Sequence, residues 1–239
     1  AVGDGVTEYN FATIPLFTLM GLLVSKAGLG RDIYDVMNST FRKVLAGIGM
    51  ATVGANAVFA AITGSSIASA SVFTKISVPE MLRYNYNKRF AVGVVAGSSV
   101  LGMIIPPSAM LIIYSFISEQ SVGDMFLAGI VPGLLLTGAY IFAIFTMARI
   151  WPSYIGQDIK ADEMPALDTS ETIHKAWPVI ALIFLVLGGI YTGWLTPVEA
   201  GAAGASLALV IAALRKSMSW NDLWSTLVET GHITAAILL

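Results

Sequence analysis

Two stretches of this 239-residue chain place hydroxyl groups beside residues that interrupt helices, and both lie in long uncharged segments. One is residues 64–66 (Gly-Ser-Ser), and the other is residues 102–108 (Gly-Met-Ile-Ile-Pro-Pro-Ser). Hydroxyls, together with the backbone groups freed where a helix is interrupted, can bind a small cation or an anion without a charged side chain. These residue types favour binding chemistry over covalent catalysis.

The composition is that of a membrane protein. Hydrophobic residues make up 56% of the chain and charged residues 12%, and the mean hydropathy is +0.78. An average soluble domain carries roughly 25% charged residues, and a membrane-crossing helix needs about 20 mainly apolar ones. The charge-free segments therefore predict an all-α polytopic membrane protein; they are residues 9–25, 44–74, 90–118, 125–148, 176–198 and 200–214.

Several functional classes are disfavoured by what the sequence lacks. It has no cysteine and only two histidines, His174 and His232, neither of which lies near an activated-serine motif. No intramembrane aspartate pair, phosphate-binding loop, charged ring or repeated filter motif is present. We therefore expect no enzyme, no resident cofactor and no nucleic-acid partner.

The positions of lysine and arginine predict a re-entrant hairpin. Basic residues lie at 42–43, before the segment 44–74, and at 83–89, after it, so both flanks face the cytoplasm. The 31 residues of the segment 44–74 are too few for two complete crossings and a turn. A hairpin over 44–82 that turns at 64–66 solves this conflict, and it places all thirteen lysines and arginines on the cytoplasmic side.

Residues 90–118 predict a helix that is broken near 102–107. Each proline removes a backbone donor and clashes with the preceding turn. Non-helical backbone persists at membrane depth only where it is buried in protein or lines a polar cavity. The break leaves free carbonyls, which suit Na+, at the end of one half-helix and free N–H groups, which suit a carboxylate, at the start of the next.

Each interruption has a purely structural alternative. Two adjacent prolines can simply kink a helix, and serine and glycine commonly serve helix packing. The stretch GAAGA (201–205) is interpreted as close helix packing of this kind. Two interruptions at similar depth favour a site for a small cation and an anionic solute.

Four motifs resemble the large membrane subunit of tripartite ATP-independent periplasmic (TRAP) transporters. They are GSSIASA (64–70), GMIIPPSAMLIIY (102–114), SVGDMFLAGIVPGLLL (121–136) and LTPVEAGAAGA (195–205). The resemblance covers essentially the whole chain, with the motifs in the order of the family. Many members carry an acidic residue a few positions after the hairpin turn, where this chain has Ser69.

The resemblance implies an elevator-type transporter fold with inverted repeats, each with a re-entrant hairpin and a broken helix. It also implies a Na+-coupled importer in the bacterial or archaeal cytoplasmic membrane. A periplasmic substrate-binding protein would deliver a small organic acid, and a small four-helix membrane subunit would accompany the large one. The chain is expected to hold about half of such a large subunit, ending before the second hairpin.

By motif position, the resemblance places a sodium site between the hairpin tip and the following break. The expected Na+ ligands, the last three through backbone carbonyls, are Ser65, Ser66, Gly102, Ile105 and Pro107. The organic acid is expected beside the same tip, at Gly64, Ser65, Ser66 and Ser108.

The same resemblance predicts four parts of the chain. A transmembrane helix and an interfacial arm helix occupy 1–43, and half of the transport core occupies 44–118. Scaffold helices with a cytoplasmic loop at 152–175 occupy 119–216, and a second repeat begins at 217–239. Two other functions stay open: a Na+/anion symporter that needs no binding protein, and a membrane scaffold subunit that transports nothing.

Overall fold

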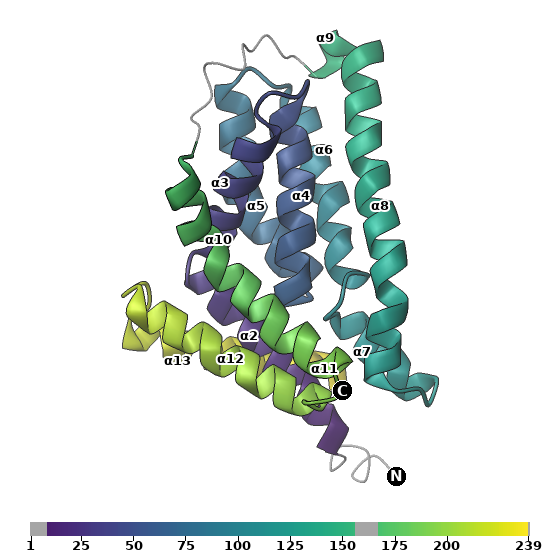
Figure 1. Cartoon of the computed structure of the whole chain (residues 1–239), viewed down its shortest axis with the longest axis vertical. Helices are drawn as coiled ribbons and strands as arrows, with labels where there is room; N and C mark the ends of the chain where they lie inside the picture. Colours follow the sequence, from purple (N-terminus) through teal and green to yellow (C-terminus); the bar gives the residue numbers. More distant parts are fainter. Residues whose placement is uncertain (1–8, 156–166, 239) are drawn as a thin grey trace.

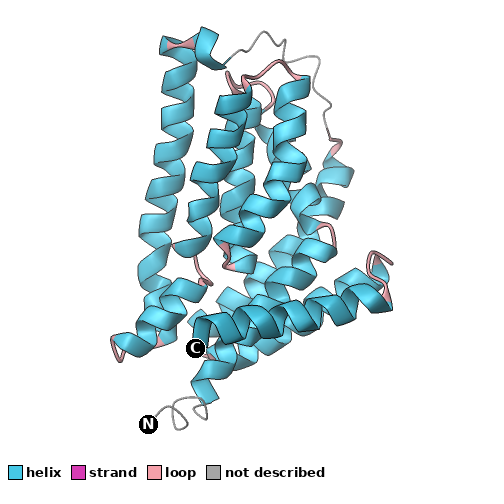
Figure 2. Ribbon diagram, turned by 180° about the vertical axis from the view of Figure 1, so that it is seen from behind, coloured by secondary structure: helices cyan, strands magenta, loops and turns pink. Residues whose placement is uncertain are grey.

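The computed structural model describes residues 9–155 and 167–238, and every regular element within these ranges is a helix (Figures 1 and 2). This confirms the predicted all-α class. Residues 1–8, residues 156–166 of the predicted cytoplasmic loop with Lys160, and Leu239 lie outside the described residues.

Three helices of the described chain are long and apolar enough to cross a membrane. They are α8 (Val122–Ile150), the continuous helical segment Thr169–Tyr191, and α12 (Pro197–Leu214). The helices α2 (Thr13–Lys26) and α3 (Leu29–Phe41) meet at a bend of 67° and form a fourth candidate if the pair counts as one span. These spans agree with a polytopic membrane protein.

Both predicted interruptions are present. Helix α4 (Gly47–Thr63) runs to a tight turn, and α5 (Ser66–Arg83) returns beside it. Helix α6 (Lys88–Ser99) continues into the 3-10 turn η2 (Val100–Met103), and α7 (Ala109–Ile117) follows after five residues that are not helical. Figure 1 shows α4, α5 and α6 side by side, with α7 lower in the same view.

The turn between α7 and α8 and the start of α12 lie at one end of the molecule, and basic residues lie at the other. The turn between α7 and α8 and the first residue of α12, Pro197, line one shared cavity. At the opposite end, the N–H of Asn87 donates to the carbonyl of Ile155 at 2.7 Å, which joins the start of α6 to α9 (Pro152–Ile155) after α8. Arg83 and Arg149 lie in the last turns of their helices at this second end, as the predicted hairpin requires.

Helix α3, predicted at the membrane interface, lies along the hairpin with its apolar face buried. Ile33 and Tyr34 are only 3% and 1% exposed. A methyl group built on Gly30 would lie 2.6 Å from a methyl group of Val72 in α5. The apolar face of this amphipathic helix therefore covers the hairpin.

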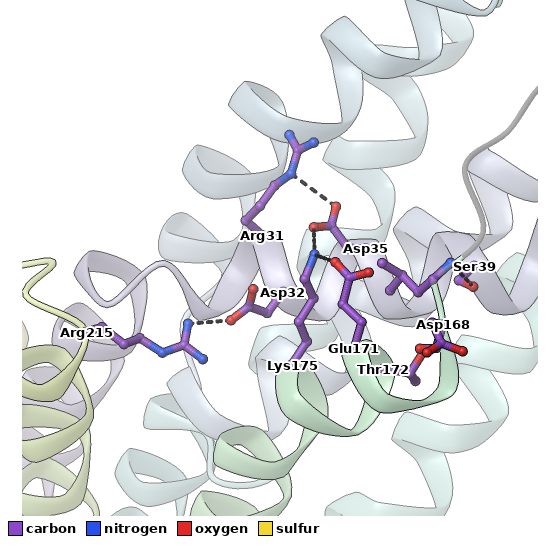
Figure 3. A network of polar contacts seen from close by, with 10 residues as sticks. Arg31, Asp32, Asp35, Ser39, Asp168, Glu171, Thr172, Lys175 and Arg215 are labelled. Carbon is purple, nitrogen blue, oxygen red and sulfur yellow. Dashed lines mark hydrogen bonds and ion pairs between the residues drawn. The ribbon is translucent and has the colours of Figure 1, made fainter.

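The polar face of α3 carries ion pairs to later helices (Figure 3). The Nζ of Lys175 in α10 (Thr169–Ile183) lies 2.8 Å from Asp35, and Arg31 lies 3.1 Å from the same carboxylate. Arg215, at the end of α12, pairs with Asp32. Helix α3 thus connects the hairpin on one face to α10 and α12 on the other.

Caps set the ends of the last helices. After α10, the π-helical turn η4 (Phe184–Gly188) and α11 (Gly189–Tyr191) lead to α12, which begins with the predicted capping box of Thr196 and Glu199. Ser219 and Asp222 exchange hydrogen bonds at the start of α13 (Trp220–Leu238), and the Ser219 hydroxyl and N–H donors hold the pKa of Asp222 below its usual range.

The stretch GAAGA brings α12 against α2, as predicted. A methyl group on Gly201 would lie 3.0 Å from Leu16, and one on Gly204 would lie 2.3 Å from the sulfur of Met20. Only small residues allow this approach. Helix α13 also packs along α2, and Lys26 lies 3.8 Å from Asp222.

A buried hydrogen bond joins the hairpin to the broken helix. The Nδ2 of Asn56 in α4 donates to the hydroxyl of Ser98 in α6 at 2.8 Å, and both residues are 1% exposed or less. The same Nδ2 lies 3.2 Å from the carbonyl of Thr52, and Ser98 donates to the carbonyl of Val94. The bond joins two residues that are 42 positions apart in sequence.

This bond predicts coupling between Asn56 and Ser98. Asn56→Ala, Ser98→Ala and the double variant should show a coupling free energy of about 0.6 kcal/mol, and not above about 1.7 kcal/mol, as for polar pairs in other membrane proteins. The free energies of unfolding in detergent-denaturant titrations supply the cycle. Thr137, whose hydroxyl bonds within α8, is the matched control, and its pairing with Ser98 should show none. Zero coupling for the Asn56 pair would contradict the bond.

Candidate functional site

The hairpin turns within two residues. Gly64 caps α4 with a left-handed φ of +58°, and its N–H donates to the carbonyl of Ala60 at 3.0 Å. Ser65 is extended, and its hydroxyl accepts the N–H of Ala68 at 3.3 Å, which caps α5. The C-terminal end of α4 and the N-terminal end of α5 therefore lie at one point.

The break in the second element is held by a serine. Pro106, Pro107 and Ser108 are all buried, and the Ser108 hydroxyl donates to the carbonyl of Met103 at 2.7 Å. This bond spans the non-helical residues. It fixes the end of η2 relative to the start of α7.

The hairpin tip packs directly into the break, backbone against backbone. A methyl group on Gly64 would lie 2.1 Å from the carbonyl oxygen of Pro107, and one on Gly102 would lie 2.8 Å from the backbone of Ser65. The N–H of Ala109 also reaches the carbonyl of Gly64 at 3.4 Å. Glycine is needed at both positions, because any side chain would separate the two elements.

Helices on two sides close around this contact. Gly129 and Gly133 of α8 face the break, where added methyl groups would lie 2.7 Å from the carbonyl of Ile104 and 2.6 Å from the Ile105 side chain. Gly21 of α2 faces the hairpin tip, since a methyl group there would lie 2.9 Å from the carbonyl of Thr63. The non-helical backbone is thus enclosed by protein.

Where the hairpin tip meets the break, some backbone N–H groups and some backbone carbonyls have no hydrogen-bond partner in the described chain. At the starts of α5 and α7, the N–H groups of Ser66, Ile67, Met110 and Leu111 donate to no acceptor in the described chain. Within the same ranges, the carbonyls of residues 105–107 accept no hydrogen bond. Helix N-termini carry partial positive charge and C-termini partial negative charge, so both an anion and a cation find complementary groups here.

A cavity of about 350 Å³ opens beside the tip. Its walls are mainly apolar, with hydroxyls from four residues, and none of its described lining residues is ionisable. Helices α2 and α13 complete the walls opposite the tip. The lining residues are Phe17, Thr18, Gly21, Leu22, Thr63, Gly64, Ser65, Ser66, Ile67, Ala68, Met103, Ala109, Met110, Ile233 and Ala236.

The expected site residues divide into two groups. Gly64, Ser65 and Ser66 line the cavity. The other four lie in the broken helix and do not line it: Gly102, Ile105, Pro107 and Ser108. The structure thus brings the two interruptions together, and the residues that flank the break, Met103 and Ala109, line the cavity with the tip.

Sequence reasoning did not identify several residues around this cavity. Thr18 and Thr63 add hydroxyls, and Met110 adds an apolar wall. The apolar runs that contain them gave no signal of which face points inward. The spacing of four between Gly129 and Gly133 did carry a signal, since small residues at that interval mark close helix approach.

The site offers neutral oxygens for a cation. In the described part of the chain, no group of three or more His, Cys, Asp and Glu side chains is placed to hold a metal ion. Ser69, one turn into α5, is fully buried and its hydroxyl has no hydrogen-bond partner among the described residues. The described residues at this point therefore offer carbonyl and hydroxyl oxygens.

Comparison with known proteins identifies the family of this chain. The model of the family described as "Tripartite ATP-independent periplasmic transporter, DctM component" matches residues 1–239. The C4-dicarboxylate TRAP transporter large permease protein DctM of Pseudomonas aeruginosa is 32% identical over 97% of this chain and 53% of the relative.

Two further relatives are named for other solutes. The sialic acid TRAP transporter large permease protein SiaM of Vibrio cholerae is 27% identical over 98% of this chain and 54% of its own. The isethionate TRAP transporter permease protein DctMQ of Oleidesulfovibrio alaskensis is 28% identical over 98% of this chain and 36% of its own. The chain thus spans about half the length of the large permeases it matches.

The family model matches residues 1–239, and the chain also has the four sequence motifs and a hairpin tip packed into a broken helix. The chain therefore belongs to the DctM family of tripartite ATP-independent periplasmic transporter components.

Proposed function

We propose that this chain forms part of a Na+-coupled importer of a small organic acid in the bacterial cytoplasmic membrane. A periplasmic binding protein would deliver the solute, and a small membrane subunit would accompany the permease. The observation that carries the proposal is the contact of the hairpin tip with the break, at Gly64, Pro107 and Gly102. This contact gathers the ends of four helical segments beside one cavity.

The proposed Na+ site lies between the tip and the break. The carbonyls of Ile105 and Pro107 are free of hydrogen bonds from the described residues, and the Pro107 carbonyl faces Gly64. Ser65 and Ser66 supply hydroxyls at the tip, and Gly102 lets the tip approach. Transporters commonly bind Na+ with unwound backbone carbonyls and helix C-terminal ends at such breaks.

The proposed solute site lies on the cavity side of the tip. The free N–H groups that begin α5 and α7 carry partial positive charge and suit the anionic group of an organic acid. The side chains of Ser65 and Ser66 and the backbone of Gly64 face the same cavity. Ser108 acts indirectly, because its hydroxyl donates to the carbonyl of Met103 and fixes the non-helical residues between them.

Coupling follows from the shared tip. A Na+ ion bound between tip and break orders the same residues that begin α5, so it stabilises the solute site. Linkage requires that the solute then increase the affinity for Na+ by the same factor. The bond between Asn56 and Ser98 keeps hairpin and broken helix together while this occurs.

The relatives' names support the class of solute and not its identity. The names include a C4-dicarboxylate, sialic acid and isethionate, which are three different organic acids. The cavity walls are apolar with neutral hydroxyls and no ionisable side chain among the described residues. We infer that the binding protein contributes most of the selection among organic acids.

Reconstituted transport tests the proposed function. The whole permease with its small subunit and binding protein should take up a labelled organic acid into proteoliposomes only when an inward Na+ gradient and the binding protein are both present. Uptake with Na+ but without the binding protein would instead indicate a symporter that works alone. No uptake of any panel member by correctly inserted protein would favour a scaffold subunit.

Substitution of the two contact glycines should abolish uptake. Gly64→Ala adds strain at φ +58° and a clash with the Pro107 carbonyl, and Gly102→Leu pushes the tip away from the break. Gly138→Leu on α8 is the matched control, because the space around its Cβ is open. Initial rates of Na+-dependent uptake, normalised to inserted protein, supply the comparison. Wild-type rates in Gly64→Ala would disprove the contact's role.

Ser66→Ala should separate ion binding from folding. The Ser66 hydroxyl makes no hydrogen bond to a described residue, so its loss removes no structural bond. We expect the Na+ concentration for half-maximal uptake to rise about tenfold, the effect of losing one neutral ligand of a charged group. Ser206→Ala on the exposed face of α12 is the control. An unchanged Na+ dependence would remove Ser66 from the ligand set.

A further inference from the structure

Another cavity, of about 210 Å³, lies between α6 and α8, near the basic end of the molecule. Its walls are apolar except at three positions, Arg89, Tyr140 and Tyr154. It shares no lining residue with the cavity at the hairpin tip. We call it the α6–α8 groove; its glycines are Gly93 and Gly97.

The groove is narrow and follows the direction of α6. Nothing lies within 4 Å of a methyl group built on Gly93, and one built on Gly97 would lie 3.6 Å from the Tyr140 ring. From Arg89 to Gly97 the helix rises by about 12 Å, close to the roughly 15 Å of hydrocarbon in one leaflet. A helix of about 10–12 Å diameter does not fit this space, whereas a single hydrocarbon chain does.

Positive charge marks one end of the groove. Arg89, which lines it, is exposed and forms no ion pair with any residue that the structure describes, and Lys88 precedes it. The bond from Asn87 to Ile155 holds α9, with Tyr154, at the same end. By the distribution of lysine and arginine this end faces the cytoplasm, where anionic headgroups occur.

We propose that the α6–α8 groove binds one anionic phospholipid of the cytoplasmic leaflet. The Arg89 guanidinium binds the phosphate, as arginine does with planar bidentate geometry. Tyr154 lies at the level of the headgroup, where tyrosines are enriched. One acyl chain occupies the groove along Gly93 and Gly97 to Tyr140. This site is independent of the proposed transport function.

Retention of lipid by the purified protein tests the proposal. The intact transporter is equilibrated in vesicles of equal phosphatidylglycerol and phosphatidylcholine, extracted in mild detergent and analysed by native mass spectrometry. We expect preferential retention of phosphatidylglycerol. Arg89→Gln should reduce that retention about fivefold, which is the effect of about 1 kcal/mol for one basic residue at an anionic membrane. Lys43→Gln, a basic residue outside the groove, is its control.

A second pair of variants tests the acyl chain. Gly93→Leu fills the open space and should remove bound phosphatidylglycerol and phosphatidylcholine alike, whereas Gly138→Leu, with open space outside the groove, should remove neither. Three results would overturn the proposal. They are equal retention of the two lipids by the wild type, no bound lipid because another protein segment fills the groove, and unchanged retention in Arg89→Gln.

Discussion

The structure depends on one constraint: backbone that leaves helical geometry at membrane depth must be enclosed by protein or line a cavity. Within the described chain, two interruptions fall in long uncharged segments, at Gly64 and between Met103 and Ala109, and they are placed against each other. Glycines on α2 and α8 then allow those helices to close over the contact. Much of the surrounding packing follows from the need to enclose these few residues.

A site built in this way offers both partial positive and partial negative charges but carries no net charge. Unpaired N–H groups begin α5 and α7, and unpaired carbonyls lie between them at residues 105–107. The formal charges of the described chain lie elsewhere, and several of them form the ion pairs of α3 with Lys175 and Arg215 (Figure 3). In the described chain, the unpaired backbone groups at the break are thus separate from the charged side chains that connect the helices.

Features that depend on local rules could be predicted from the sequence, whereas features that depend on tertiary packing could not. Prolines, glycines and basic flanks predicted both interruptions and the pairing of α4 with α5, and Thr196 with Glu199 predicted a capping box. The position of α3 was not recoverable, because an amphipathic face fits a hairpin as well as a membrane surface. The same holds for Ser108, whose partner, the Met103 carbonyl, depends on how the break folds.

The frame of the site is made from main-chain atoms of Gly64, Gly102 and Pro107, and this has a consequence for evolution. A frame made of main-chain atoms does not depend on the side chains of the cavity wall, so substitution at positions such as Thr18 and Met110 can reshape the cavity without altering the frame. Related chains can therefore differ in their cavity walls while inheriting the same frame. Relatives with about 30% identity are named for different solutes, a C4-dicarboxylate, sialic acid and isethionate.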